Sequence, residues 1–136
     1  METQRALEFI AANNRAVLGT YHRDGRMQLS PVTVGVDQAG RLVISTRETA
    51  YKVRNLRRDP RAVLCVLTDR FFGDWLQIEG EAEVLALPDA MQPLVDYYRG
   101  ISGEHPDWDE YRAAMVRERR VLVRVTVTRA GPDRRG

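Results

Sequence analysis

Apolar and polar residues alternate along much of this chain, and the apolar runs are separated by turn residues. A period of two residues turns one face of a strand toward a core and the other toward solvent. The pattern predicts six β-strands: Ala16–Tyr21, Arg26–Val36, Arg41–Thr46, Arg61–Thr68, Trp75–Leu85 and Val121–Val127. Asp24-Gly25 is a strong hairpin signal, so we expect the first two strands to pair directly.

Four segments with helical character lie before and between these strands. They are Thr3–Asn13, an arginine-rich segment that begins at Tyr51, Pro88 to about Arg99, and Trp108–Glu118. Mostly hairpin-connected strands with inserted helices predict a mainly β (α+β) fold, a small closed or nearly closed antiparallel barrel. We expect residues 1–136 to form one domain, with 129–136 as a flexible tail because Gly131-Pro132 and several arginines follow the last strand.

The second predicted strand combines polar residues with a proline. Its alternation places Gln28, Ser30 and Val32 on one face. Pro31 lies between them and has no backbone N–H to donate, so we expect the ladder to break or bulge there. Taken alone, Gln28 and Ser30 are ordinary polar strand residues.

Bulk composition excludes few classes of protein. The 136 residues fit one domain, and 43% hydrophobic with 29% charged residues is typical of a soluble globular protein. A net charge of +2 and a pI near 9.0 are too mildly basic to indicate nucleic-acid binding. Cys65 has no second cysteine to pair with, which favours a reducing cytoplasm. No apolar run is long enough to span a bilayer, and the N-terminus lacks the pattern of a signal peptide.

The segment Tyr51–Arg61 is the most informative stretch of the chain. It holds five cations against one carboxylate and follows a strand that ends in Ser45-Thr46. A helix start carries free backbone N–H groups and the positive end of the helix dipole, and both favour an anion. Lys52 would add a mobile charge and Arg54 a planar fork of donors. A solvated helix face is the alternative interpretation of the same residues.

Residues for acid–base, nucleophilic or metal chemistry are scarce. The sequence has no Ser-His-Asp arrangement and no metal-ligand spacing, and its two histidines are His22 and His105. This disfavours a hydrolase or a metalloenzyme and leaves the catalytic residues unknown. We interpret His22 as exposed and without a role. His105 lies in a predicted loop, where it could gate a pocket, donate a proton or do neither.

Four motifs occur in a recognisable order: residues 24–31 (DGRMQLSP), 45–46 (ST), 52–61 (KVRNLRRDPR) and 98–112 (YRGISGEHPDWDEYR). With them the chain resembles the split β-barrel flavin-binding superfamily named after pyridoxamine 5′-phosphate oxidase. The resemblance runs from Ala16 to about Val127 and is closest to the actinobacterial branch that uses the deazaflavin coenzyme F420. The third and fourth motifs are specific when they occur together.

The resemblance implies a homodimer with the cofactor in a groove between two barrels. One implied set of residues lies along the tricyclic ring: Gln28, Ser30, Pro31 and Val32. A second set would hold the ribityl phosphate and the tail carboxylates: Ser45, Thr46, Lys52 and Arg54. Val53 adjoins this second set, and Trp75 would come from the neighbouring subunit. Ala50 stands where the family often has an arginine, so Arg47 is a candidate to replace it.

Three functions remain open from the sequence. The first is an F420-dependent oxidoreductase that transfers a hydride between the reduced deazaflavin and an unsaturated small molecule. The second is an FMN-dependent oxidase or reductase on the same fold. The third is a non-catalytic module that carries a cofactor or binds nucleic acid.

The arginine content favours the first of these functions. The oligoglutamate tail of F420 would reward an extended cationic channel, which five residues could line: Arg47, Lys52, Arg54, Arg57 and Arg58. FMN ends at its phosphate and needs fewer cations. Only 7% aromatic residues and an acidic strand face argue against single-stranded nucleic acid.

Overall fold

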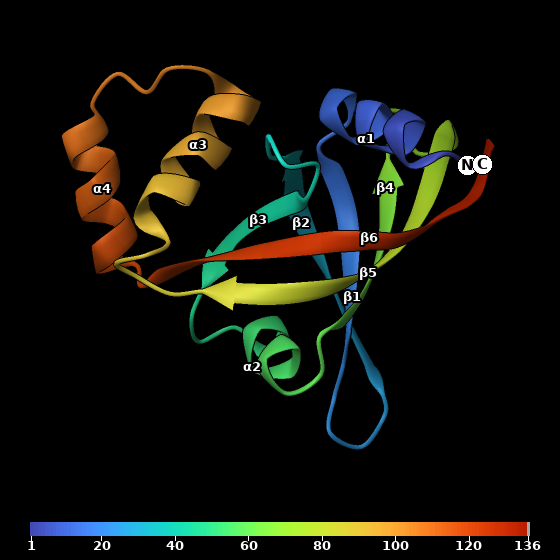
Figure 1. Cartoon of the computed structure of the whole chain (residues 1–136), viewed down its shortest axis with the longest axis horizontal. Helices are drawn as coiled ribbons and strands as arrows, with labels where there is room; N and C mark the ends of the chain where they lie inside the picture. The colour runs from blue at the N-terminus through green and yellow to red at the C-terminus, as the bar shows by residue number, and fades with distance from the viewer. Residues whose placement is uncertain (136) are drawn as a thin grey trace.

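Six antiparallel strands close into a barrel in the order β1-β2-β3-β6-β5-β4 (Figure 1). The computed structural model describes residues 1–135, and the side chains of residues 1–132. The strands are β1 (Arg15–Tyr21), β2 (Met27–Val36), β3 (Leu42–Arg47), β4 (Arg61–Leu67), β5 (Asp74–Leu85) and β6 (Arg120–Arg135). The helices are α1 (Thr3–Ala12), α2 (Tyr51–Arg58), α3 (Met91–Ser102) and α4 (Trp108–Arg117).

The predicted fold class is confirmed, because all the predicted strands and helices are present and the strands form a closed antiparallel barrel. Most element ends agree closely with the sequence pattern. α3 begins at Met91 rather than at Pro88. Pro88 instead lies in a turn, in which its carbonyl accepts a hydrogen bond from Met91 N at 3.0 Å.

The C-terminal strand is longer than its sequence pattern indicates. The sequence predicts a flexible tail from Arg129, but β6 continues to Arg135 and pairs with β5 as far as Asp74. The prediction was wrong because β5 extends past the predicted end of β6. Its backbone N–H and C=O groups pair with the added residues of β6, and polar side chains do not prevent this pairing. A register shift between Leu76 and Ile78 falls opposite Gly131-Pro132. Gly136 lies outside the described residues.

Helices close both ends of the barrel (Figure 1). α1 lies over one end and contributes the fully buried Ala6 and Ile10 to the core. α2 lies at the opposite end, where Leu56 joins the same core. Asn55 in α2 is also buried, and its Nδ2 donates to Thr20 Oγ1 of β1 at 3.1 Å. This buried hydrogen bond gives the cationic helix a fixed place under the barrel.

α3 and α4 build a second, smaller core on the outer face of β3 and β6. Its buried members are Val43, Ala90, Leu94, Val95, Tyr111, Met115 and Leu122. Strand alternation explains the two cores, because Val43 faces the helices while Leu42 and Ile44 face the barrel interior. The Tyr111 hydroxyl donates to Leu94 O at 2.8 Å and ties α4 to α3.

β2 and β3 separate after three paired positions, Val34–Val36 with Leu42–Ile44. Beyond Val34, β2 follows β1 to Met27, while β3 follows β6. The β1–β2 ladder passes Pro31 without a shift, so the predicted break there was wrong. Val34 N–H donates to Asn14 O on the β1 side, so alternation turns the backbone of Pro31 toward the opposite edge, where no N–H is needed. We call the gap between the two diverging strands the split.

Gly80 and Gly100 provide a matched test of this packing. A Cβ at Gly80 would lie 2.5 Å from Thr126 O, whereas a Cβ at Gly100 in α3 would meet nothing within 4 Å. We expect Gly80→Ala to lower the free energy of unfolding by about 2 kcal/mol or more. Gly100→Ala should raise it by about 0.5–1 kcal/mol, because alanine favours a helix. Urea denaturation measures both values, and equal stabilities would contradict the close approach of β5 and β6.

Candidate functional site

Two of the predicted site residues meet at the split. Lys52 Nζ in the first turn of α2 donates to Ser30 Oγ on β2 at 3.2 Å, although 22 positions separate the two residues. Ser30 lies on the same strand face as Val32, which packs against the barrel core. The ammonium group is therefore held at the inner side of the open β2 edge.

Lys52 is a cation without a counter-ion among the side chains that the structure describes. It is the only lysine in the sequence, and it is half-buried. Among the side chains that the structure describes, none forms an ion pair with it. Burial lowers the pKa of Lys52 from its ordinary value of 10.5. A partly desolvated ammonium with a hydroxyl partner retains donors for an anion.

Gln28 lies two residues before Ser30 on the same face of β2, and its side-chain carbonyl oxygen is an unsatisfied acceptor among the described residues. Its Nε2 donates to Leu29 O at 3.3 Å. Its Oε1 is buried and has no hydrogen-bond partner within the part of the chain that the structure describes. A buried carbonyl oxygen without a donor is costly, so this position favours a ligand N–H or a water molecule beside it.

Ser45 and Thr46 do not act on the same side of β3. Thr46 is buried on the face that Leu42 and Ile44 turn into the barrel. Ser45 is half-buried and follows Val43 toward α3. The two side chains therefore cannot face one phosphate together, as the alternation of a strand requires.

The remaining residues of the predicted phosphate set differ in exposure. Val53 is fully buried and belongs to the packing of α2. Arg54 is exposed, with its guanidinium 5.7 Å from the centre of the Tyr51 ring. Arg47 is exposed, and its guanidinium lies 3.9 Å from the Glu118 carboxylate. Arg54 is therefore better placed than Arg47 to extend the charge of Lys52 along α2.

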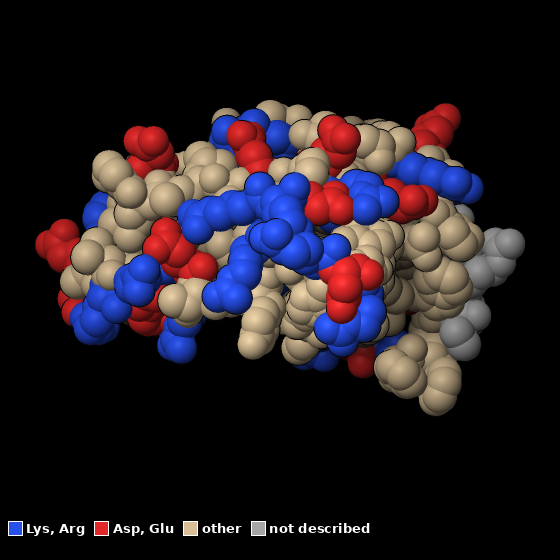
Figure 2. All heavy atoms as spheres, turned by 90° about the horizontal axis from the view of Figure 1, so that it is seen from below, with Lys and Arg blue, Asp and Glu red and all other residues tan. Residues whose placement is uncertain are grey.

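The outer side of α2 carries a basic cleft. Its volume is about 510 Å³, and its lining residues are His22, Arg23, Tyr51, Arg54, Asn55, Arg57 and Arg58. Figure 2 shows Lys and Arg side chains gathered across the middle of this face. Arg57 lies 3.5 Å from Glu48, and Arg58 donates to Tyr21 O. Only part of the predicted five-residue cationic channel is therefore available to a ligand.

A second cavity, of about 550 Å³, lies between α1, the β2–β3 turn and α3. Its apolar surface includes Val36, Val43, Ile101 and Leu122. The sequence patterns did not predict this cavity. Gly35 was the available signal, because a Cβ at this position would lie only 3.1 Å from Ile101 Cδ1.

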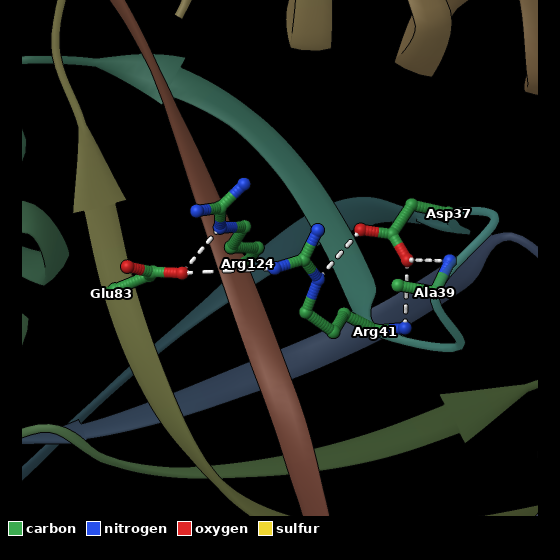
Figure 3. Close-up of polar contacts among 5 residues, drawn as sticks. All are labelled: Asp37, Ala39, Arg41, Glu83 and Arg124. Carbon is green, nitrogen blue, oxygen red and sulfur yellow. Dashed lines mark hydrogen bonds and ion pairs between the residues drawn. The ribbon is translucent and has the colours of Figure 1, made fainter.

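Polar residues on one side of this second cavity form a chain of alternating charge (Figure 3). Arg41 Nε donates to Asp37 Oδ2 at 2.9 Å, and its Nη1 lies 4.0 Å from Glu83. Arg124 donates to the same Glu83 carboxylate. Asp37 also accepts the backbone N–H of Ala39 at 2.9 Å. The chain fixes the β2–β3 turn against β5 and β6.

Trp75 and His105 lie away from Lys52 in this chain. Trp75 is on β5 opposite Leu67, and β5 does not neighbour β2 in the barrel. His105 packs against the rings of Tyr98 and Trp108, and its Nδ1 accepts the backbone N–H of Asp107 at 2.9 Å. His105 therefore holds the loop between α3 and α4, and its contacts do not reach the split.

Two observations bear on other classes of site. Within the described residues, no group of three His, Cys, Asp or Glu side chains is placed to hold a metal ion. None of the helices in residues 1–135 has both the length and the apolar character needed to cross a bilayer.

The fold and these motifs identify the family. The family model described as pyridoxamine 5′-phosphate oxidase matches residues 2–131, so the chain belongs to this family. The superfamily that the sequence motifs indicate is thereby confirmed.

Solved structures show the same fold. A conserved hypothetical protein from Mycobacterium tuberculosis is 25% identical, with a TM-score of 0.76 over 96% of this chain and 82% of that one. A protein named F420 reductase is 20% identical, with a TM-score of 0.67 over 91% of this chain and 94% of that one. A haem-binding protein from Mycobacterium smegmatis is 19% identical, with a TM-score of 0.70 over 98% of this chain and 57% of that one.

The lowered pKa of Lys52 makes a prediction about stability. Below this pKa the desolvated charge destabilises the fold, and the cost is relieved as pH rises toward 10.5, because the unfolded chain then binds more protons. We expect Lys52→Met to leave the free energy of unfolding at pH 7 unchanged or higher, with the gain shrinking toward pH 10.5.

Denaturation of both proteins across this pH range measures the difference. Arg61→Met is the matched control, because Arg61 has an ion-pair partner, Asp59 at 2.7 Å, and the pKa of Asp59 is about 2. The Arg61 variant should show no such pH dependence. A loss of stability at pH 7 in Lys52→Met would show that the ammonium already has a favourable partner.

Proposed function

We propose that this protein is an F420-dependent oxidoreductase that transfers a hydride between the reduced deazaflavin and an unsaturated small molecule. The observation that carries the proposal is the pairing of Lys52 with Ser30 at the split, where a half-buried ammonium has no anionic partner among the described side chains. An anionic ligand would supply that partner. Membership of an oxidase family and the likeness to a protein named F420 reductase support a redox cofactor as this ligand.

The residues present fit such a cofactor. Lys52 would hold a phosphate or carboxylate group. The side-chain carbonyl oxygen of Gln28 would accept an N–H of the tricyclic ring and so gain the hydrogen bond that it lacks among the described residues. Pro31 leaves the β2 edge without one N–H, so a planar group could lie along it. When bound, the cofactor supplies the hydride, and the chain supplies binding, orientation and electrostatics.

The basic cleft favours F420 over FMN. It continues from α2 toward Arg23, and Arg54 lies on its lining. FMN would need little beyond Lys52, whereas the carboxylates of an oligoglutamate tail would use further cations. An FMN-dependent oxidase or reductase of the same fold is the alternative, and a cofactor carrier without turnover is the second alternative.

The second cavity is our candidate for the substrate. Tyr97 lines this cavity and also contacts Thr33, at the end of the split where β2 and β3 part. An apolar molecule in the cavity would therefore lie near a cofactor in the split. The apolar surface of Val36, Val43 and Leu122 suits an unsaturated hydrocarbon skeleton.

We further propose that the active form is a homodimer. The outer face of β2, β1 and β4 carries apolar side chains that remain partly exposed in the single chain: Met27, Leu29, Pro31, Val17, Val63, Cys65 and Leu67. Such a contiguous face is typical of a protein interface. A second copy would cover it, and would also bring a Trp75 that lies remote from Lys52 within one chain.

Cofactor titration tests the proposal directly. Quenching of F420 fluorescence should saturate at micromolar protein, and Lys52→Ala should weaken binding by about tenfold or more, because a hydrogen bond to a charged group is lost. The melting temperature of Lys52→Ala should stay near that of the natural protein. Arg117→Ala is the control, because it removes an exposed cation of α4 whose ion-pair partner is Glu110 in the same helix.

The same titration with FMN separates the alternatives. Tight binding of FMN with no binding of F420 would replace the first proposal by the FMN-dependent one. Binding of F420 without reduction of any unsaturated compound would indicate a carrier. Binding of neither dye would contradict the proposed function.

Sedimentation tests the homodimer. Leu29 on β2 and Val116 on α4 are exposed to similar extents in one chain, 62% and 60%. We expect the natural protein and Val116→Glu to sediment as dimers, and Leu29→Glu to sediment as a monomer because it places a charge on the proposed interface. A monomeric natural protein would refute the proposed interface.

A further inference from the structure

A tyrosine that the motif analysis does not assign to the site lies where the barrel splits. Continuing the β2–β3 ladder by one position beyond Val34 and Ile44 would place Thr33 opposite Ser45, but this pair is not formed. Instead, the Tyr97 hydroxyl from α3 donates to Thr33 O at 2.8 Å. The Ser45 backbone lies close enough to this hydroxyl to lower its pKa.

The hydroxyl occupies the place of a ladder hydrogen bond. Val34 N–H donates to Asn14 O on the β1 side, so alternation turns the backbone groups of Thr33 toward β3. A direct bond from Ser45 N–H to Thr33 O would bring the strands to a spacing of about 4.8 Å. A hydroxyl that lies beside Ser45 and donates to Thr33 takes more room than that direct bond.

We propose that Tyr97 is a positioning residue that holds β2 and β3 apart at the point where the two strands part. It thereby sets one end of the slot, by which we mean the part of the split that contains Ser30 and Lys52. This inference rests on the proposed function in one respect: the slot is where the cofactor binds. The ligand does not need to touch the tyrosine, because the effect acts through the separation of the strands.

The environment of Tyr97 suits this role. The side chain is half-buried, and burial raises the pKa of the hydroxyl, against the opposing effects of the Ser45 backbone and the Arg120 charge. The hydroxyl therefore stays protonated at neutral pH and keeps its donor for Thr33. Because Tyr97 also lines the second cavity, it lies at the boundary between that cavity and the slot.

Tyr97→Phe removes the hydroxyl and keeps the ring. We expect Thr33 and Ser45 to pair directly, which shortens the slot and weakens F420 and FMN binding by about three- to tenfold. Tyr111→Phe is the matched control, because its hydroxyl also donates to a backbone carbonyl at 2.8 Å but lies between α4 and α3. It should lower the melting temperature and leave dye affinity unchanged.

A ligand-free measurement separates this inference from the proposed function. In Tyr97→Phe, NMR should detect a scalar coupling across a new hydrogen bond from Ser45 N–H to Thr33 C=O, which is absent in the natural protein. If the natural protein binds neither dye but this coupling appears in the variant, the proposed function fails. The proposal that Tyr97 holds β2 and β3 apart is then still supported. If the coupling does not appear, or if a dye that binds the natural protein binds the variant with the same affinity, the positioning role is overturned.

The natural protein provides a test that does not depend on the folding of a variant. With 13Cζ-labelled tyrosine in half-deuterated water, a hydroxyl trapped between strands exchanges slowly and gives two resolved signals. Tyr97 should show two signals, as should the buried Tyr111. A single averaged signal for Tyr97 would overturn the proposal.

Discussion

The early end of hydrogen bonding between β2 and β3 is the constraint on which the rest of this structure depends. The two strands share three paired positions and then follow different neighbours, β2 along β1 and β3 along β6. A barrel that was closed over its full height would expose no strand edge. Here one edge stays open, and α2 lies under it. The features that we assign to ligand binding lie on this edge or beside it.

The electrostatics of the split follow from this arrangement. Asn55 and Leu56 anchor α2 to the barrel, which directs Lys52 toward the open edge at Ser30. The anchoring holds the Lys52 ammonium in a partly desolvated position, where no carboxylate among the described side chains forms an ion pair with it. Free energy that is lost by desolvation in the free protein is recovered when an anion binds, so the site is poised for a ligand rather than for stability.

The sequence predicts the barrel well because its strands follow a period of two and its helices interrupt that period. It also indicates Ser30 and Lys52 as candidate site residues, through the resemblance of their motifs to a known family, and the fold shows that these two candidates touch. Strand alternation already implies that Ser45 and Thr46 face opposite sides, which the motif analysis overlooked. The tail prediction failed because pairing with β5, rather than side-chain pattern, holds residues 129–135 in β6.

Other parts of the site could not be predicted from sequence. Tyr97 acts through the register between β2 and β3, and no local pattern contains that register. The second cavity arises where α3 crosses the β2–β3 turn, and its lining residues come from five elements and turns along the chain. In both cases the determining contacts join segments that are far apart in sequence.

The single lysine of this chain allows a direct measurement at the proposed site. Selective labelling of lysine with 13Cε gives one side-chain signal, that of Lys52, which can be followed while F420 or FMN is added. The account predicts a saturable shift of this signal and a rise in the pKa of Lys52 on binding. A dye that binds without changing either the signal or its pKa would contradict the account.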